Sequence, residues 1–502
     1  MSAAALIRAA ATQPCLPVPR HVLDEAGWRE MALALAHEPT LDLLAMWADT
    51  GHVHALFDDR AGAGEILLAS TPASGGRYAA LSPARMAAAW FERMILDLWG
   101  HAAEGARDLR PWLDHGRWEM SAPMAQRPTP AAGNPEPPGF HPFEGDSLHQ
   151  VAIGPVHAGI IEPGHFRFTA QGETVARLEV RLGYAHKGML VLMRGKSPRV
   201  AARFAARLSG DSTVAHGIAF ARATEAATTA AIPARAESLR AAMAEMERIA
   251  NHLADLGALG QDAGFAPLPA RCLLLREAML EAARAAFGHR LMMDAVIPGG
   301  VASDIAPDGA AAILRAVDAV AAELPRLLDL FGNVASLADR VIGTGIVQPS
   351  LAVRMAAGGF VGRASGRVCD LRVRPGYAPY DRLAVQAPLL VAGDVDARLR
   401  VRAAEITESI RLLRVLLDGL PTGEISFGLP AASGEGLGWA EGFRGDIWHW
   451  LRLDGGLIAS VFLRDPSWLH WPLLEAAVEG NILADFPLIN KSINGSISGV
   501  DL

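Results

Sequence analysis

Two segments far apart in the chain contain the side chains best suited to site chemistry. The first, RLSGDSTVAHGIAFARATE, runs from Arg207 to Glu225 and offers hydroxyl, carboxylate and imidazole groups in a short span. The second, ADFPLINKSINGSISGVDL, runs from Ala484 to Leu502. Hydroxyl and carboxylate oxygens are hard ligands that suit cations such as Ca²⁺ or Mg²⁺ and not soft metals. These residues indicate a hydrogen-bonded polar pocket or, as the alternative, a site for a hard cation.

A third segment, IGPVHAGIIEPGHFRF from Ile153, places an acid between two histidines. Glu162 is flanked by His157 and His165. A buried acid can relay protons when its surroundings move its pKa toward neutrality. The structural alternative is a carboxylate that accepts backbone amides in a turn, beside histidines that hold ordinary hydrogen bonds. The residues alone leave both interpretations open.

Composition limits the class of protein and its compartment. The three cysteines, Cys15, Cys272 and Cys369, lie far apart and show no paired spacing. We therefore expect neither a disulfide framework nor a cysteine metal site, and a reducing cytoplasm fits best. The net charge of -8 implies no overall attraction to nucleic acid or anionic lipid, although a local basic face stays open. No stretch of about 18 uncharged apolar residues occurs, so we expect no transmembrane segment.

The elements that must position these groups fall into two units. Residues 1–119 alternate short apolar segments (ALFDD, EILLAS) with one helical stretch, ARMAAAWFERMILDLWG, which predicts a small α+β domain. Residues 120–145 are rich in proline and glycine, which predicts a linker without regular hydrogen bonding. Residues 146–502 form the second unit.

Periodicity in the second unit predicts a helical bundle that carries a small antiparallel sheet. Apolar residues alternate in HQVAIG, HFRFTA and ARLEVRLGY, as in strands with one buried face. They recur at intervals of three and four in AESLRAAMAEMERIANHLADLGALG, as on one face of a helix. Comparable helical patterns occupy residues 269–293, 309–338 and 397–419. The predicted fold class is therefore α+β.

Several further motifs, in this order, carry a resemblance to a known family. They are LGYAHKGM from Leu182, MERIANHL from Met246, FGHRLMMDAVIPGGV from Phe287 and GRASGRVCDLR from Gly362. Together with the three segments above, they resemble the large subunit of membrane-bound nickel–iron hydrogenases and the 49-kDa-type subunit of respiratory complex I. FERMILDLWG with DLRPWL, residues 91–113, resembles the end of the 30-kDa-type subunit of complex I. The whole chain is similar to the fused large subunits of the formate-hydrogenlyase type.

The resemblance is weakest where the family binds nickel. The family motifs read Arg-x-Cys-Gly-x-Cys and Asp-Pro-Cys-x-x-Cys. Here Ser209 and Ser212 stand at the first pair of cysteine positions, and Ser496 and Gly499 at the second. Soft thiolates hold nickel, whereas a serine hydroxyl is hard and stays protonated near neutral pH. We expect no metal bound by this chain. The complex I tyrosine that faces the quinone aligns with Gly210, so that site is incomplete too.

The resemblance also implies which residues meet. In the family the two terminal motifs converge at the base of the bundle, so we expect a small polar pocket, filled with water in preference to a hard cation held by Asp211. The predicted pocket residues are His165, Ser209, Asp211, Ser212, His216, Asp485 and Ser496. Glu162 and His157 are the candidate residues for proton transfer. Arg363, Arg367 and Asp370 are expected to hold partner surfaces or to stabilise the bundle, and EGFRGD, residues 441–446, resembles a segment beside the active site.

The implied function is that of a subunit in a complex-I-like or hydrogenase-related membrane redox assembly, active only within a multisubunit complex. Expected partners are an iron–sulfur small subunit, which would carry the nearest cluster, and integral membrane subunits of an ion-translocating module. No nucleic acid is expected. The chain would lie peripherally on the cytoplasmic face of the inner membrane, and quinone is the leading acceptor. The alternatives are a noncatalytic scaffold and, disfavoured by the missing sulfur ligands, a functional hydrogenase.

Overall fold

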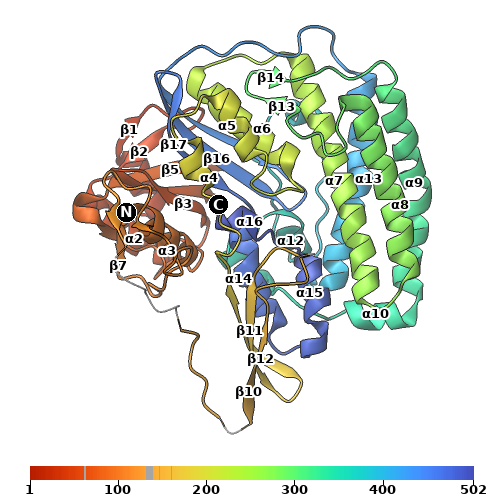
Figure 1. Ribbon diagram of the computed structural model, residues 1–502, viewed down its shortest axis with the longest axis horizontal. Coiled ribbons are helices and arrows are strands. Elements are labelled where there is room, and N and C mark those ends of the chain that lie inside the picture. The colour runs from red at the N-terminus through yellow and green to blue at the C-terminus, as the bar shows by residue number, and fades with distance from the viewer. Residues whose placement is uncertain (62–63, 132–138, 146, 160) are drawn as a thin grey trace.

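The structure is a computed structural model that describes residues 1–61, 64–131, 139–145, 147–159 and 161–502 (Figure 1). Helices and several small sheets occur in the same chain, which confirms the predicted mixture of the two. No helix within these ranges is both long enough and apolar enough to cross a membrane.

The N-terminal unit, defined here as α1 to β7, is built on a five-stranded sheet in the order β1-β2-β5-β4-β3. Only the β2–β5 pair is parallel. Its elements are α1 (Ala3–Ala9), β1 (Ala11–Gln13), β2 (Arg20–Val22), α2 (Glu25–Ala34), β3 (Leu41–Ala48), β4 (His52–Asp59), β5 (Glu65–Pro72), β6 (Arg77–Ala79), α3 (Ala88–Trp99) and β7 (Ala102–Glu104). The sheet is covered on both faces where β3 lies, since every residue of β3 is buried.

The stretch predicted as a linker is more regular than its composition suggests. Two short strands, β8 (Met120–Ser121) and β9 (Thr129–Pro130), form an antiparallel pair. The expectation that this stretch lacks regular hydrogen bonding is therefore wrong at these positions. A two-residue strand pair tolerates proline at its edge, where no amide donor is needed. Residues 132–138 lie outside the described ranges.

The three-stranded antiparallel sheet predicted from alternating apolar residues is confirmed. It consists of β10 (Leu148–Ile153), β11 (His165–Gln171) and β12 (Thr174–Arg181), in that order. This sheet extends away from the rest of the molecule at the bottom of Figure 1. The long loop between β10 and β11 contains the predicted acid and its two histidines.

The long helices are α7 (Ala234–Asp262), α8 (Pro267–Phe287), α9 (Gly309–Asn333) and α13 (Val395–Asp418), and they lie side by side in Figure 1. The predicted helix over 269–293 is too long at its end. Gly288 has a φ of 81° and stops α8, because this left-handed conformation is favourable for glycine and ends a helix. The predicted helix over 309–338 is interrupted at Val334, where the backbone is extended before α10.

A second antiparallel sheet was not predicted. Strands β15 (Gly434–Glu441), β16 (Asp446–Asp454) and β17 (Leu457–Arg464) lie beneath α6 (Thr213–Thr228). The alternating glycines of β15 allow the helix backbone to approach closely. A Cβ at Gly436 would lie 2.0 Å from the carbonyl oxygen of Ala223, and one at Gly438 would lie 2.2 Å from that of Ala219. Glycine at every second position thus marks helix-on-sheet contact here and not a loop.

Shorter elements complete the chain. They are η1 (Leu35–His37), η2 (Ser74–Gly76), α4 (Met189–Met193), α5 (Pro198–Ala205), β13 (Val296–Ile297), β14 (Gly300–Val301), α10 (Ala335–Val341), α11 (Pro349–Arg354), α12 (Gly359–Ala364), η3 (Arg372–Gly376), η4 (Tyr380–Arg382), α14 (Ser467–Val478), η5 (Leu483–Asp485), α15 (Phe486–Ile493) and α16 (Ser498–Asp501).

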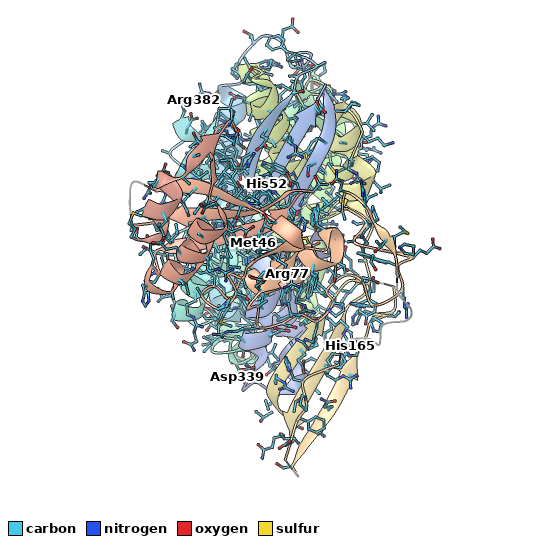
Figure 2. All side chains as sticks on the ribbon, turned by 90° about the vertical axis from the view of Figure 1, so that its left-hand side faces the viewer. Met46, His52, Arg77, His165, Asp339 and Arg382 are labelled. Carbon is cyan, nitrogen blue, oxygen red and sulfur yellow. The ribbon has the colours of Figure 1, made fainter. Side chains whose placement is uncertain are left out.

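The N-terminal unit packs against the β15–β17 sheet. The ring of Trp47 stacks on that of Phe462 with centroids 5.3 Å apart, and the Arg20 guanidinium pairs with the Glu435 carboxylate at 2.8 Å. Figure 2 looks onto this unit, with Met46 and His52 labelled on its central strands, in front of the sheet. The two parts of the chain therefore share an apolar and ionic interface.

Candidate functional site

The two terminal motifs meet, as the resemblance implied. Ser209 and Ser212 lie in the turn that leads into α6, where the Ser212 amide donates to the Ser209 carbonyl oxygen at 3.1 Å. Ser496 lies in the turn between α15 and α16. The Ser209 hydroxyl donates to the Ser496 Oγ at 2.8 Å and to Asp211 Oδ1 at 3.0 Å. Four of the predicted pocket residues are thus within one hydrogen-bonded cluster, which we call the serine cluster: Ser209, Asp211, Ser212 and Ser496.

An arginine holds the centre of the serine cluster. Arg444, in the turn between β15 and β16, donates from Nη1 and Nη2 to the two oxygens of Asp211, each at 2.6 Å. Its Nη1 also lies 3.4 Å from the Oγ of Ser209 and 3.3 Å from that of Ser212. The sequence indicated only that residues 441–446 belong near the site. Which side chain enters it depends on the tight turn that the structure shows.

The arginine and the aspartate form a fixed ion pair. Partial burial raises the pKa of Asp211, but the Arg444 guanidinium more than offsets this effect and holds that pKa below its ordinary value. Burial lowers the pKa of Arg444, and Asp211 reverses the shift so that it ends above its ordinary value. Bidentate pairing of this kind is both strong and geometrically specific. Arg444 Nε donates to the carbonyl oxygen of Asn494 at 2.6 Å, which ties the pair to the closing segment.

The donor set does not fit nickel. The cluster offers hydroxyls and one carboxylate whose two oxygens are already bound by a guanidinium, whereas nickel of this kind requires soft thiolates. The cysteines lie in other parts of the chain, before β2, in α8 and after α12. Nor is there, among the residues that the structure describes, a group of three or more His, Cys, Asp or Glu side chains arranged to hold a metal.

His216 belongs to a neighbouring chain of three buried groups. Its Nε2 lies 2.9 Å from Asp465 Oδ2, and its Nδ1 lies 3.0 Å from His449 Nε2. Burial raises the pKa of Asp465, and contact with His216 reverses the shift and lowers it well below the ordinary range. Burial lowers the pKa of His449. Sequence reasoning missed Asp465 and His449, because no motif in β16 or β17 marked them.

Gly499 leaves room for this carboxylate. A Cβ at Gly499 would lie between 2.7 and 3.0 Å from three side-chain atoms of Asp465. One of the former cysteine positions is therefore occupied from across the fold by an aspartate. The Ser496 Oγ accepts the Gly499 amide at 3.0 Å, so the two sets of groups are contiguous.

The loop between β10 and β11 is tied to the closing segment through Glu162. One carboxylate oxygen of Glu162 accepts the amides of Ile497 and Ser498, each at 2.9 Å. His157 Nε2 lies 2.8 Å from the Gly164 carbonyl oxygen. His165 Nδ1 lies 3.4 Å from the carbonyl oxygen of Gly154, and burial lowers its pKa. These contacts match the structural interpretation of the three residues, and none of the three touches the serine cluster through a side-chain hydrogen bond in the described ranges.

Asp485 does not join the pocket, and its predicted convergence is wrong. Its carboxylate pairs with Arg340 at 3.0 Å, at the start of α15. The eight residues of α15 place Asp485 about 12 Å along the chain axis from Asn494. The aspartate of the family motif therefore has no carboxylate counterpart beside Ser496.

A mainly apolar cavity of about 120 Å³ lies beside Asp211, between α7, α8 and the turn after α8. Its lining includes Met246, Met279 and Leu280, with Glu247 on the polar side. Burial raises the pKa of Glu247 to about 8, although two amides oppose the shift. Its carboxylate accepts the amides of Val214 at 2.7 Å and Ala215 at 3.1 Å, so it caps the first turn of α6.

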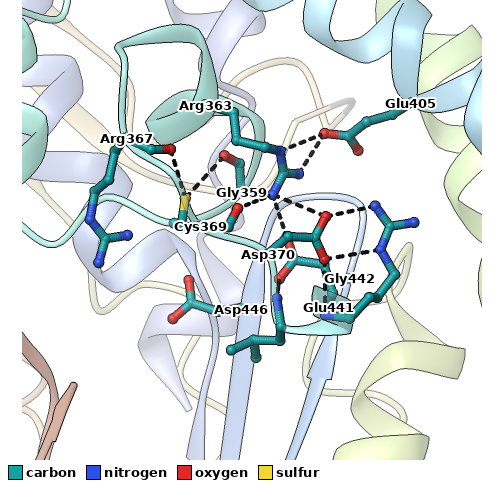
Figure 3. A network of polar contacts seen from close by, with 12 residues as sticks. Gly359, Arg363, Arg367, Cys369, Asp370, Glu405, Glu441, Gly442 and Asp446 are labelled. Carbon is teal, nitrogen blue, oxygen red and sulfur yellow. Dashed lines mark hydrogen bonds and ion pairs between the residues drawn. The ribbon is translucent and has the colours of Figure 1, made fainter. Parts of the chain in front are cut away.

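The arginines of the GRASGRVCD motif belong to a buried charge network that Figure 3 shows. Arg363 pairs with Glu405 and, at 3.0 Å, with Glu441, and it also lies near Asp370. These contacts stabilise the bundle, which is one of the two predicted roles. Arg367 instead pairs at 2.7 Å with Asp42 in the N-terminal unit. Burial, reinforced by Asp370, raises the pKa of Glu441 to about 7.

Comparison with known proteins gives two matching family profiles. The family described as "Respiratory-chain NADH dehydrogenase, 49 Kd subunit" matches residues 262–430, and "Nickel-dependent hydrogenase" matches residues 187–259. The two profiles thus cover adjacent parts of the helical region.

Three curated proteins are similar over most of their length. The carbon monoxide-induced hydrogenase of Rhodospirillum rubrum is 30% identical over 70% of this chain and 99% of its own. A subunit of the NADH-quinone oxidoreductase of Dehalococcoides mccartyi is 30% identical over 70% and 97%. Formate hydrogenlyase subunit 5 of Escherichia coli is 29% identical over 84% and 77%, and this match extends into the N-terminal unit.

A solved structure shares the fold. A chain in the membrane-bound sulfane sulfur reductase, an archaeal respiratory membrane complex, superimposes with a TM-score of 0.67 at 23% identity. The match covers 72% of this chain and 100% of that chain.

Proposed function

Because the chain belongs to the family that unites the large subunits of membrane-bound hydrogenases with the 49-kDa-type subunits of NADH-quinone oxidoreductase, we propose that it serves a related membrane redox assembly without a nickel–iron centre. It would lie peripherally on the cytoplasmic face, between an iron–sulfur small subunit and integral membrane subunits. Its task would be electron transfer coupled to movement of protons or another ion.

One observation carries the proposal. The guanidinium of Arg444 lies within hydrogen-bonding reach of both serines at the first pair of cysteine positions and neutralises Asp211. A fixed cation at this point repels a metal ion and occupies the carboxylate that a hard cation would need. The fourth position, Gly499, faces Asp465 and supplies no ligand. The site is thus suited to hydrogen bonding and charge stabilisation.

For the acceptor we propose a quinone. The cavity beside Asp211 has an apolar wall of methionine and leucine and a polar end with Glu247 and Asn251. Such a combination suits a ring with an apolar body and a carbonyl that accepts a hydrogen bond. Gly210, which aligns with the complex I tyrosine, also lines this cavity, so the head group would be bound differently from that in complex I.

The test uses the complete membrane assembly. Metal analysis should find no nickel in stoichiometric amount, and electron transfer to a water-soluble quinone should fall at least about tenfold in Asp211→Asn, since loss of the ion pair leaves Arg444 uncompensated. Asp485→Asn is the matched control, because its carboxylate lies outside the cluster and should leave the rate unchanged. One firmly bound nickel per chain together with hydrogen turnover would overturn the proposal, as would an unaltered rate in Asp211→Asn.

A noncatalytic scaffold is the second candidate, and the contacts of Glu162 favour it. The carboxylate of Glu162 holds two amides of the closing segment, a role that requires no proton transfer. Unchanged electron transfer in Glu162→Gln and His157→Asn, with intact assembly, would agree with a scaffold around these residues. Loss of transfer with intact assembly would restore them as proton carriers.

We further propose the domain limits that the sequence indicates. Residues 1–119 would form a domain of the 30-kDa type, residues 120–145 a connection, and residues 146–502 the large-subunit domain. The interface between the N-terminal unit and the β15–β17 sheet supports a permanent association of the two.

A further inference from the structure

One face of the molecule carries positive charge that the chain does not neutralise. Between Glu179 and Asp211 the sequence contains no acidic residue, although the whole chain has a net charge of -8. This segment folds into α4, α5 and their connections, on the side that faces the viewer in Figure 1. The basic face is defined by four side chains: Arg194, Lys196, Arg199 and Arg203.

All four side chains are exposed, and no ion pair involves any of them among the described residues. The two other cations nearby are engaged elsewhere. Arg207 forms a bidentate pair with Asp294, and the Lys187 ammonium donates to two carbonyl oxygens. Like charges that gather without a counter-ion repel one another, so this face gains free energy when an anionic surface covers it.

Aliphatic side chains lie among the cations. Val191, Leu192 and Val200 keep 40%, 44% and 46% of their surface exposed. The inner face of α5 is formed by small buried residues, Ala201 and Ala205 among them, so its basic and aliphatic side chains point outward. Such a combination of cations with aliphatic groups on one surface is typical of segments that lie at a membrane interface.

The basic face is preformed and rigidly mounted. The connection between α4 and α5 is joined to β17 by two backbone hydrogen bonds: the Gly195 amide donates to the Ile458 carbonyl oxygen at 2.8 Å, and the Ile458 amide donates to that of Lys196 at 2.9 Å. Binding therefore requires no folding of the segment. Ordering costs that weaken other peripheral segments are small here.

We propose that the basic face binds the anionic phosphate head groups of the membrane surface. Clusters of four to eight Lys and Arg residues recognise anionic lipids, and guanidinium groups pair readily with phosphate. A protein partner is the weaker choice, since lysine is depleted at protein interfaces and the exposed aliphatic groups need an apolar boundary layer. The inference rests on the proposed placement at a membrane, and it adds a lipid contact made by this chain itself.

The test is flotation of the full chain with vesicles of phosphatidylcholine, with or without phosphatidylglycerol. The chain should bind only the vesicles that contain phosphatidylglycerol, and added salt should weaken binding. Each removed charge should cost about fivefold in affinity, so the combined variant Arg194→Gln, Lys196→Gln, Arg199→Gln and Arg203→Gln should lose at least about a hundredfold. The matched control removes four exposed arginines from α8 and α9: Arg271, Arg284, Arg315 and Arg326.

The outcomes separate this inference from the proposed function. Equal binding to both kinds of vesicle, or retained binding in the basic-face variant, would refute it. If vesicles never bind but the variant no longer co-purifies with the membrane subunits, the face contacts an acidic protein and the lipid proposal is wrong. Electron transfer in the detergent-solubilised assembly should be normal in the variant, so failure of the redox proposal would leave the vesicle result unaffected.

Discussion

At the scale of single residues, the loss of sulfur ligands is accompanied by a rearrangement that uses the vacated space. Gly499 is the clearest case, because the Asp465 carboxylate lies where a side chain at residue 499 would begin. That carboxylate accepts the hydrogen bond of His216, which in turn contacts His449. The absence of a side chain at residue 499 is therefore a requirement of the buried chain of acid and imidazoles.

Gly499→Cys should destabilise the protein and should not restore nickel binding. The new Cβ would lie within 3.0 Å of Asp465, and overpacking of a buried site costs about 1–3 kcal/mol. Urea unfolding of the isolated chain measures the difference, and Gly210→Ala is the control, because a Cβ at Gly210 meets no atom within 4 Å. A fully stable Gly499→Cys protein would show that Asp465 moves freely and that the proposed occupation of this space is incorrect.

At the scale of elements, α14 and β12 meet through a buried acid. Glu475 of α14 accepts the Val180 amide of β12 at 2.8 Å. Burial raises the pKa of Glu475 to about 8, although the amide opposes the shift. The folded chain therefore keeps a proton on this carboxyl group at pH values where the unfolded chain, with an ordinary pKa near 4.3, has lost it.

It follows that the wild-type protein loses stability as pH rises from about 5 to about 8, since the folded state binds more protons than the unfolded state over this range. Glu475→Gln keeps an oxygen that can accept the Val180 amide and cannot ionise. Its free energy of unfolding should exceed that of the wild type by at least about 1 kcal/mol at pH 8, and the two should be similar at pH 5. Chemical unfolding at both pH values measures this, and Glu281→Gln, exposed on α8, should show no pH-dependent difference. Parallel pH profiles for the wild type and Glu475→Gln would contradict the buried, protonated state.

Elements were predicted from the sequence where a single periodicity dominates. The alternation in β10–β12 and the apolar stripes of α7 and α13 each bury one face, so their patterns identified them. The β15–β17 sheet escaped because β15 has glycines where a strand would show large apolar residues, and their reason is the backbone of α6. The serine cluster could be inferred from its motifs, whereas Arg444 depends on a turn and Asp485 on the length of α15. Such distances arise from tertiary structure and not from spacing along the chain.

At the scale of the whole molecule, the first and last thirds of the chain are interlocked. Arg20 of β2 forms a bidentate pair with Glu435 of β15, and both side chains are about nine-tenths buried. Arg367 reaches Asp42 on β3, and the rings of Trp47 and Phe462 stack across the same interface. A boundary drawn near residue 119 separates two sequence segments that share a core.

Arg20→Met should therefore destabilise the whole chain and not only its N-terminal unit. Removal of one partner from a buried pair leaves an uncompensated charge and costs about 3–5 kcal/mol, whereas replacement of both partners by apolar residues restores much of the loss. The single variant should unfold at lower urea concentration, and Arg20→Met with Glu435→Leu should regain stability. Arg29→Met removes an exposed pair with Glu104 and should change the free energy of unfolding by less than about 1 kcal/mol. If Arg20→Met unfolds in two transitions, of which the second matches the wild type, the units are independent and the interface does not stabilise the large unit. A single shifted transition instead means that the N-terminal unit holds the β15–β17 sheet, and through α6 the serine cluster, in place.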